Sequence, residues 1–95
     1  MSAEPARSVR FPLGRTVITR GALDALDEAD VRAGIARHAI GDWGDLCPED
    51  REANDDAVQV GTRVLSAYHT DGGLKFWVIT EADRSATTVL LPEEY

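Results

Sequence analysis

The chain has 95 residues, 43% of them hydrophobic and 28% charged, and its formal net charge at pH 7 is −7. This length allows one domain with one hydrophobic core and excludes two, and the composition excludes a chain that is disordered throughout. The excess of carboxylates argues against direct binding of nucleic acid, which needs clustered Lys and Arg to neutralise phosphates.

The compartment is indicated by what the chain lacks. No apolar run approaches the roughly 18 residues needed to cross a bilayer, and the N-terminus has no apolar signal-peptide core. The single cysteine, Cys47, cannot form an internal disulfide, which fits a reducing environment. We therefore expect a cytoplasmic protein with no membrane partner.

The chain begins with a tail and a short strand. Residues 1–10 (MSAEPARSVR) show no periodicity and are expected to be a flexible tail, so residues 11–95 form the single domain. The segment 15–18 is rich in β-branched residues and predicts a fourth strand at an edge of the sheet.

Two helices are predicted next. Thr19 is a candidate N-cap for a short helix over residues 21–29, and Asp30 is a candidate cap for a second helix, which Gly41 ends. The apolar stripe of the second helix is expected to face the sheet and consists of Val31, Ile35, His38 and Ala39.

A third helix is predicted from Pro48 to Val60. Proline suits the first helical position, Glu49 and Asp50 suit the positive end of the helix dipole, and Gly61 ends the helix. Its inner face is expected to carry Ala53, Ala57 and Val60. The other faces are almost entirely acidic or amide side chains.

The C-terminal part reads as a meander of three consecutive antiparallel strands. Alternation with period two predicts strands over residues 63–69 and 74–80, joined by the turn Asp71-Gly72-Gly73. A polar loop leads to a third strand over residues 86–91, which Pro92 ends. The fold class is therefore α+β: a three- to four-stranded antiparallel sheet, built on this C-terminal meander, with two or three short helices on one face.

One group of potential metal ligands lies around the end of the second helix. His38, Asp42, Asp45 and Cys47 fall within ten residues, but their spacing matches neither usual pair of zinc ligands. We expect instead that His38 flanks the apolar stripe, that Cys47 is a small buried group, and that the aspartates are solvated. No metal and no other cofactor is predicted.

A second group lies at the predicted hairpin. His69 and Asp71, with Ser66 or Ser85 brought near by strand pairing, have the residue types of a nucleophile and its base. There is no G-x-S-x-G turn to expose the nucleophile, and a histidine that faces solvent is the simpler interpretation. No catalytic residue is predicted.

A third group occupies the loop before the last strand. Glu81 and Asp83 could do acid/base or metal chemistry, although an E-x-D-R sequence in a hairpin loop more often forms salt bridges and turn caps. Asp83 and Arg84 could also form a recognition tip, because loops at the ends of sheets commonly carry binding residues.

The acidic residues are unevenly spread. Between residues 42 and 56, seven acids accompany Arg51 alone, whereas four arginines and one glutamate precede residue 22. The acidic segment has two interpretations. It is a solvated face that keeps the protein soluble, or it is an anionic surface that docks on a basic protein groove.

Three motifs carry a resemblance to a known group of proteins: FPLGR at residues 11–15, GDWGDL at residues 41–46 and ITEADRSATTVLLPEEY at residues 79–95. With these, the chain from Phe11 to Tyr95 resembles small uncharacterised bacterial proteins of plasmids and other mobile elements, often labelled plasmid-related proteins. Some relatives carry labels that link them to restriction-modification subunits, but this chain lacks the length and motifs of a methyltransferase. The resemblance implies a mobile-element accessory protein, for which opposing host defence is a common occupation.

The leading hypothesis is a non-enzymatic protein that binds a basic site on a nucleic-acid-handling host protein, as an anti-restriction or anti-CRISPR inhibitor would. The partner-binding residues predicted are Asp42, Asp45, Glu49, Asp50, Glu52, Asp55, Asp56, Asp83 and Arg84. One alternative is a small metal-dependent hydrolase that uses the first or third group above. A second alternative is an assembly module that forms a homodimer through the edge of its sheet or an exposed Trp77 face.

Overall fold

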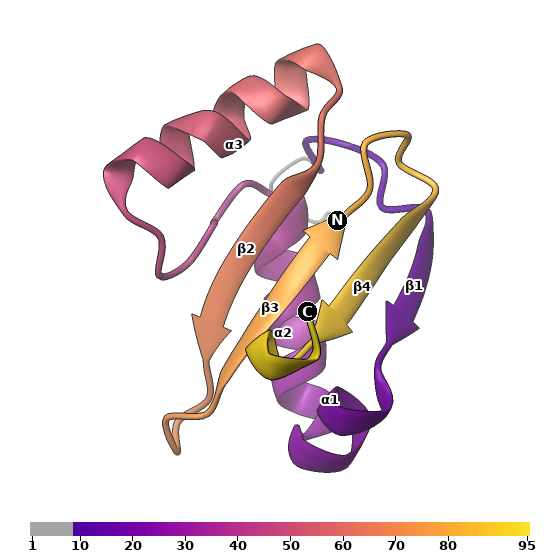
Figure 1. The fold of residues 1–95 in the computed structure, drawn as a ribbon, viewed down its shortest axis with the longest axis vertical. Coiled ribbons are helices and arrows are strands. Elements are labelled where there is room, and N and C mark those ends of the chain that lie inside the picture. Colours follow the sequence, from indigo (N-terminus) through magenta and orange to yellow (C-terminus); the bar gives the residue numbers. More distant parts are fainter. Residues whose placement is uncertain (1–8) are drawn as a thin grey trace, which may run out of the picture.

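The computed structural model of the chain describes residues 9–95, and Figure 1 shows its arrangement. Within these residues four strands form one sheet in the order β1-β4-β3-β2, with β1 at Arg15–Ile18, β2 at Val64–His69, β3 at Lys75–Thr80 and β4 at Ala86–Leu90. The helices are α1 (Arg20–Ala25), α2 (Glu28–Ala39) and α3 (Pro48–Val60), followed at the C-terminus by a short 3-10 turn, η1 (Pro92–Glu94). The α+β class expected from the sequence is therefore confirmed.

The sheet is mixed, which corrects the expectation of a purely antiparallel one. The predicted meander is present, since β2 pairs antiparallel with β3, and β3 with β4. The fourth strand pairs parallel with β4, with Arg15 opposite Ala86 and Ile18 opposite Val89. An alternating pattern reveals a strand but carries no information about its direction, because direction depends on where the chain returns to the sheet.

The main core lies between the sheet and the helices α1 and α2; in Figure 1, α2 lies behind the sheet and α1 lies at the lower end of β1. Gly34 lets α2 approach closely, because a Cβ there would come within 2.7 Å of the Phe76 ring. The buried residues of this core are Ala22, Leu26, Tyr68, Phe76, Val78, Val89 and Leu91. A second cluster forms where α3 meets the start of β2 and consists of Phe11, Trp43, Ala57 and Val64.

The ends of the helices follow their capping residues. The Thr19 hydroxyl accepts the backbone N–H of Ala22 at 3.2 Å, as expected of an N-cap. The second helix begins at Glu28 after the cap residue Asp27, three residues earlier than predicted. The third has the predicted bounds, and Gly61 ends it in the left-handed conformation with φ of 85°.

The inner face of α3 differs from the prediction. Ala57 is buried, but Ala53 is exposed and the exposed fraction of Val60 is 72%. The buried polar residue Asn54 takes the inner position. Its side-chain amide donates to the carbonyl of Leu65 and accepts the N–H of Leu65, on the outer edge of β2. Two hydrogen bonds therefore decided the rotation of this helix, which the alanine pattern could not predict.

The connector before α3, residues 40–47, covers the next part of the same edge of the sheet. Ala67 of β2 donates its N–H to the carbonyl of Trp43 at 3.1 Å, and its carbonyl accepts the N–H of Asp45 at 2.7 Å. Exposed strand edges invite pairing with other chains, and proteins commonly cover them. The β2 edge is thus occupied at Leu65 and Ala67 by the protein's own polar groups.

The expected tail falls largely outside the described residues. Its last residue, Arg10, belongs to the folded part, because its N–H donates to the Ala39 carbonyl and its guanidinium pairs with Asp55. In the described part of the chain, every helix is too short or too polar to span a membrane.

Candidate functional site

The acidic surface is formed mainly by α3 and is set by the register of that helix. Because a helix repeats every 3.6 residues, Glu49, Glu52 and Asp56 share one face, and that face points away from the buried Asn54 and Ala57. All three acids are exposed. The acidic face is therefore turned outward by the same contacts that attach the helix to β2.

Three of the seven acids in this segment are bonded to other side chains of the protein. Asp42 makes a bidentate ion pair with Arg37, with nitrogen to oxygen distances of 2.7 and 3.2 Å, and this contact lowers the pKa of Asp42. Asp45 pairs with His69 at the end of β2. These two acids hold the connector in place and are poor candidates for contacts with a partner.

The third of these bonded acids, Asp55, lies on α3 itself. Its carboxylate accepts the indole N–H of Trp43 at 3.1 Å and pairs with Arg10 at 3.0 Å, and these two hydrogen bonds lower its pKa. Asp42, Asp45 and Asp55 therefore differ from the other predicted contact residues in that their carboxylates already have partners inside the protein.

The other four acids form what we call the acidic patch: Glu49, Asp50, Glu52 and Asp56. None of them forms an ion pair with a residue in the range 9–95. The nearest base along the chain, Arg51, donates instead to the carbonyls of Leu46 and Gly44, at 3.0 and 3.3 Å. The four carboxylates of the patch therefore make no direct ion pair with a described residue, and Arg51 is the one base within the helix.

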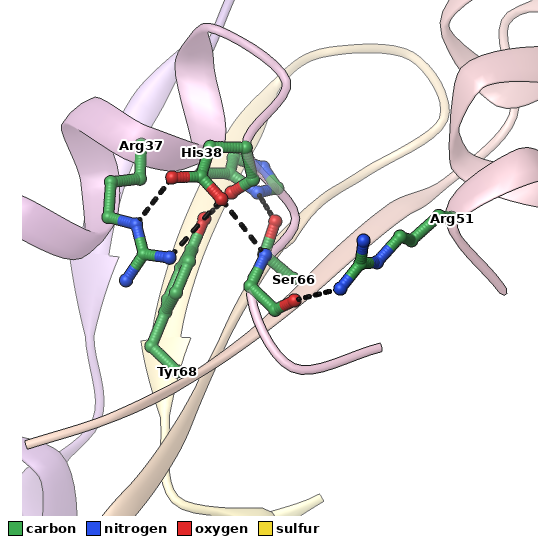
Figure 2. Close-up of polar contacts among 7 residues, drawn as sticks. Arg37, His38, Arg51, Ser66 and Tyr68 are labelled. Atoms are coloured by element: carbon green, nitrogen blue, oxygen red, sulfur yellow. Dashed lines mark hydrogen bonds and ion pairs between the residues drawn. The ribbon is translucent and has the colours of Figure 1, made fainter. Parts of the chain in front are cut away.

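Figure 2 shows polar contacts that fix the connector before α3. The Arg37 guanidinium lies over the Tyr68 ring, 4.6 Å from its centre, while the Tyr68 hydroxyl donates to the Asp42 carbonyl at 2.6 Å. The Asp42 carboxylate also accepts the N–H of Gly44 at 3.3 Å. Because these bonds constrain the residues that precede α3, the helix and its patch are attached to the sheet by a rigid approach.

The predicted recognition tip has a structural role at Arg84. This residue has a positive φ of 61°, and its guanidinium donates to the carbonyls of Thr62 and Ala57 at 2.8 and 3.0 Å. A cation at the C-terminal end of α3 also interacts favourably with the helix dipole. Arg84 thus binds the loop before β4 to the end of α3, and the prediction that it forms a recognition tip is not supported by its contacts.

Asp83, the other residue of that tip, is exposed. Its carboxylate accepts the N–H of Ser85 at 3.0 Å, and hydrogen bonds from Ser85 lower its pKa. It therefore caps the turn, as the structural interpretation of the loop expected.

His38 forms a buried chain of hydrogen bonds that the sequence did not reveal. Its Nδ1 lies 2.6 Å from the hydroxyl of Ser66 (Figure 2), and its Nε2 lies 2.8 Å from the hydroxyl of Thr80. Thr80 contacts Thr87 at 2.7 Å, and the Thr87 hydroxyl donates to the carbonyl of Leu13, also at 2.7 Å. These side chains come from α2, β2, β3 and β4, so the chain of bonds crosses the interior.

The direction of each proton follows from this arrangement. Since Thr87 gives its one proton to Leu13, Thr80 must donate to Thr87, and Nε2 of His38 must donate to Thr80. A neutral His38 then accepts the proton of Ser66 at Nδ1. Burial lowers the pKa of His38 from 6.5 to about 4, and the positive charge of Arg84 acts in the same direction.

This chain of bonds uses every polar atom of the imidazole ring. His38 and Ser66 each have an exposed fraction of 0%, so neither can reach a substrate from solvent. The group therefore contributes to the interior of the fold, and it offers no accessible base or nucleophile.

The remaining predicted groups do not assemble into sites. His38 is buried in its hydrogen-bond chain, Asp42 and Asp45 have other partners, and Cys47 is exposed, which corrects its expected burial. Among residues 9–95, no three or more His, Cys, Asp or Glu side chains are grouped to hold a metal ion. His69 is exposed as expected, but its partner is Asp45 and not Asp71.

Comparisons with protein-family models, with curated proteins and with solved structures found no match. The assignment of a site therefore depends on the geometry of this chain alone. Sequence reasoning identified the acidic helix but missed Asn54 and the His38 chain of bonds. A polar residue among apolar ones in a helical stripe was the only signal for Asn54 and His38.

Proposed function

We propose that this protein is a non-enzymatic binding module whose acidic patch occupies a basic surface of another protein. The observation that carries the proposal is that Glu49, Asp50, Glu52 and Asp56 are exposed on one helix without an ion-pair partner among residues 9–95. Like charges on one exposed helix repel one another and destabilise the folded protein. Binding to a surface of opposite charge removes this repulsion.

The spacing of the patch supports a basic surface of one kind, a site for nucleic acid. At a rise of about 1.5 Å per residue, the four carboxylates between residues 49 and 56 span about 10 Å along the helix. Averaged over this length the spacing is about one charge per 3 Å, comparable with roughly 3.4 Å per charge along one strand of duplex DNA, with Asp50 on a different side of the helix from the other three. A groove lined with Lys and Arg for a phosphate backbone therefore has the charge density to accept this helix.

The rigid attachment of α3 supports the same proposal. Asn54, Arg84 and the bonded aspartates fix the helix to the sheet at its middle, its end and its approach. A helix that is already ordered loses little conformational entropy on binding, so more of the electrostatic attraction contributes to affinity. The acids that were predicted as contacts but found bonded thus act by positioning the acids that are free.

The resemblance to plasmid-borne proteins suggests the setting. A mobile-element protein that occupies the nucleic-acid site of a host defence protein would act as an anti-restriction or anti-CRISPR inhibitor. Such a partner works in the cytoplasm, and the proposal places this protein there.

The test is capture of partners from a bacterial lysate on the immobilised full chain. We expect basic nucleic-acid-binding proteins to be retained at low salt and to be released by added duplex DNA or by raised salt, because both compete with the patch. The triple variant Glu49→Lys/Glu52→Lys/Asp56→Lys should fold normally by circular dichroism and retain none of them.

A matched control separates the patch from net charge. The variant Asp71→Lys/Glu81→Lys/Glu93→Lys changes the net charge equally at three exposed positions outside α3, and it should capture partners as the unmodified chain does. Equal capture by both triple variants, or capture that duplex DNA does not disturb, would contradict the proposal.

A further inference from the structure

The two edges of the sheet differ in whether other parts of the protein cover their backbone groups. The β2 edge is covered at Leu65 and Ala67 by Asn54 and the connector, as described above. At the other edge lies β1, on the side of the sheet opposite to α3 in Figure 1. In the described part of the chain, no element pairs with the outer side of β1.

The unpaired backbone groups of this edge can be named. The N–H of Arg15 donates to the Ser85 carbonyl and the N–H of Thr19 to the Val89 carbonyl, both at 3.0 Å. Since backbone groups alternate between the two sides of a strand, Thr16 and Ile18 direct their N–H and C=O groups away from β4. Among residues 9–95, this edge therefore offers two donors and two acceptors that have no backbone partner.

We propose that β1 is a homodimer interface, in which two copies pair antiparallel through this edge. With the twofold axis at Val17, Thr16 of one copy faces Ile18 of the other, and each facing pair exchanges two hydrogen bonds. All four unpaired groups of each copy are then satisfied by four hydrogen bonds. The two sheets become one continuous sheet of eight strands.

Side chains on the open face of the sheet favour the same register. Ile18 packs toward the helices, so Arg15, Val17 and Thr19 point to the opposite face. In the proposed dimer Val17 of one copy faces Val17 of the other, and Arg15 faces Thr19 of the other copy. The Thr19 hydroxyl is bonded to the carboxylate of Glu94 at 2.5 Å, so the exposed guanidinium of Arg15 meets a negative charge.

Exposed apolar surface lies close to this edge. Leu23 of α1 has an exposed fraction of 58% and borders, with Ile18, Leu26 and Val31, a hollow at the end of β1. Because α3 contacts β2, at the edge of the sheet opposite to β1, the dimer leaves both copies of α3 free at its two far ends (Figure 1). The dimer is therefore independent of the proposed function of the acidic patch.

The test is sedimentation equilibrium of the full chain over a wide concentration range, combined with hydrogen exchange. We expect a monomer–dimer equilibrium in which the amides of Thr16 and Ile18 gain protection as the dimer forms. Thr16→Pro removes an outward N–H while sparing every bond from β1 to β4, and proline is accepted at such edge positions. Losing two hydrogen bonds per dimer should raise the dissociation constant roughly 30-fold.

A second variant keeps the test decisive if proline perturbs the strand. Arg15→Glu places two like charges beside each other at both ends of the interface and should raise the dissociation constant roughly tenfold. Lys75→Glu makes the same change of charge at an exposed residue of β3, outside the proposed interface, and should leave the constant unchanged. A chain that stays monomeric at its highest soluble concentration overturns the proposal, as does a dimer that neither Thr16→Pro nor Arg15→Glu weakens.

Discussion

The buried chain of bonds at His38 and the acidic patch on α3 lie in the same small domain but satisfy their polar groups in opposite ways. Every polar atom of the imidazole finds a partner inside the protein, and the residue has no contact with solvent. The carboxylates of the patch are exposed and form no ion pair with a described residue. The comparison teaches that the first group serves stability, whereas the second contributes little to stability and is available to a partner.

The largest difference expected between the two groups is that His38 makes the stability of the protein depend on pH. Because the pKa of His38 is lowered from 6.5 to about 4, the unfolded chain binds a proton in this window that the folded protein does not. The contribution is fully present above pH 6.5 and is lost as the pH falls toward 4. It amounts to about 3 kcal/mol, to be measured by urea unfolding at a series of pH values.

Two variants test whether His38 causes this pH dependence. In His38→Gln, whose amide cannot titrate, the loss of stability between pH 6.5 and about 5 should disappear, and only the carboxylates with a lowered pKa, such as Asp42 and Asp55, should cause a loss below about pH 5. In His69→Gln the loss should remain, since His69 is exposed and paired only with Asp45. A loss of equal size in His38→Gln would show that other groups cause it.

A smaller effect is expected from Asn54, the buried amide on the acidic helix. Asn54→Ala removes both bonds to the backbone of Leu65 and leaves that N–H and C=O unpaired in a partly buried place. We expect the free energy of unfolding to fall by about 2 kcal/mol, as judged from thermal or urea unfolding. Gln59→Ala, at an exposed position of the same helix, should change it by less than about 0.5 kcal/mol.

The smallest effects are expected in the acidic patch. Glu49 lies in the first turn of α3, where a negative charge interacts favourably with the helix dipole, so Glu49→Gln should destabilise by about 0.3 kcal/mol. Asp56 lies nearer the other end of the helix, and Asp56→Asn should be neutral or slightly stabilising. Losses above about 1 kcal/mol in either variant would mean that the patch has a structural role, which would remove the contrast with His38.

The contrast was only partly predictable. Net charge and its concentration between residues 42 and 56 were visible in the sequence, and so was the helix that carries the patch. The neutralisation of Asp55 was not, because its partner Arg10 is 45 positions away along the chain. The same holds for His38, whose partners lie 28 and 42 positions away and come from different strands.

The sequence by itself determined the local elements. Pro48 and Gly61 set the bounds of α3, the Asp-Gly-Gly turn joined β2 to β3, and period-two alternation marked the strands, because each depends on neighbours a few residues apart. Only the tertiary structure decided the parallel direction of β1, the rotation of α3 onto Asn54, and which acids were bonded and which were left free. These features depend on contacts between distant segments, and such contacts leave no periodic trace in the chain.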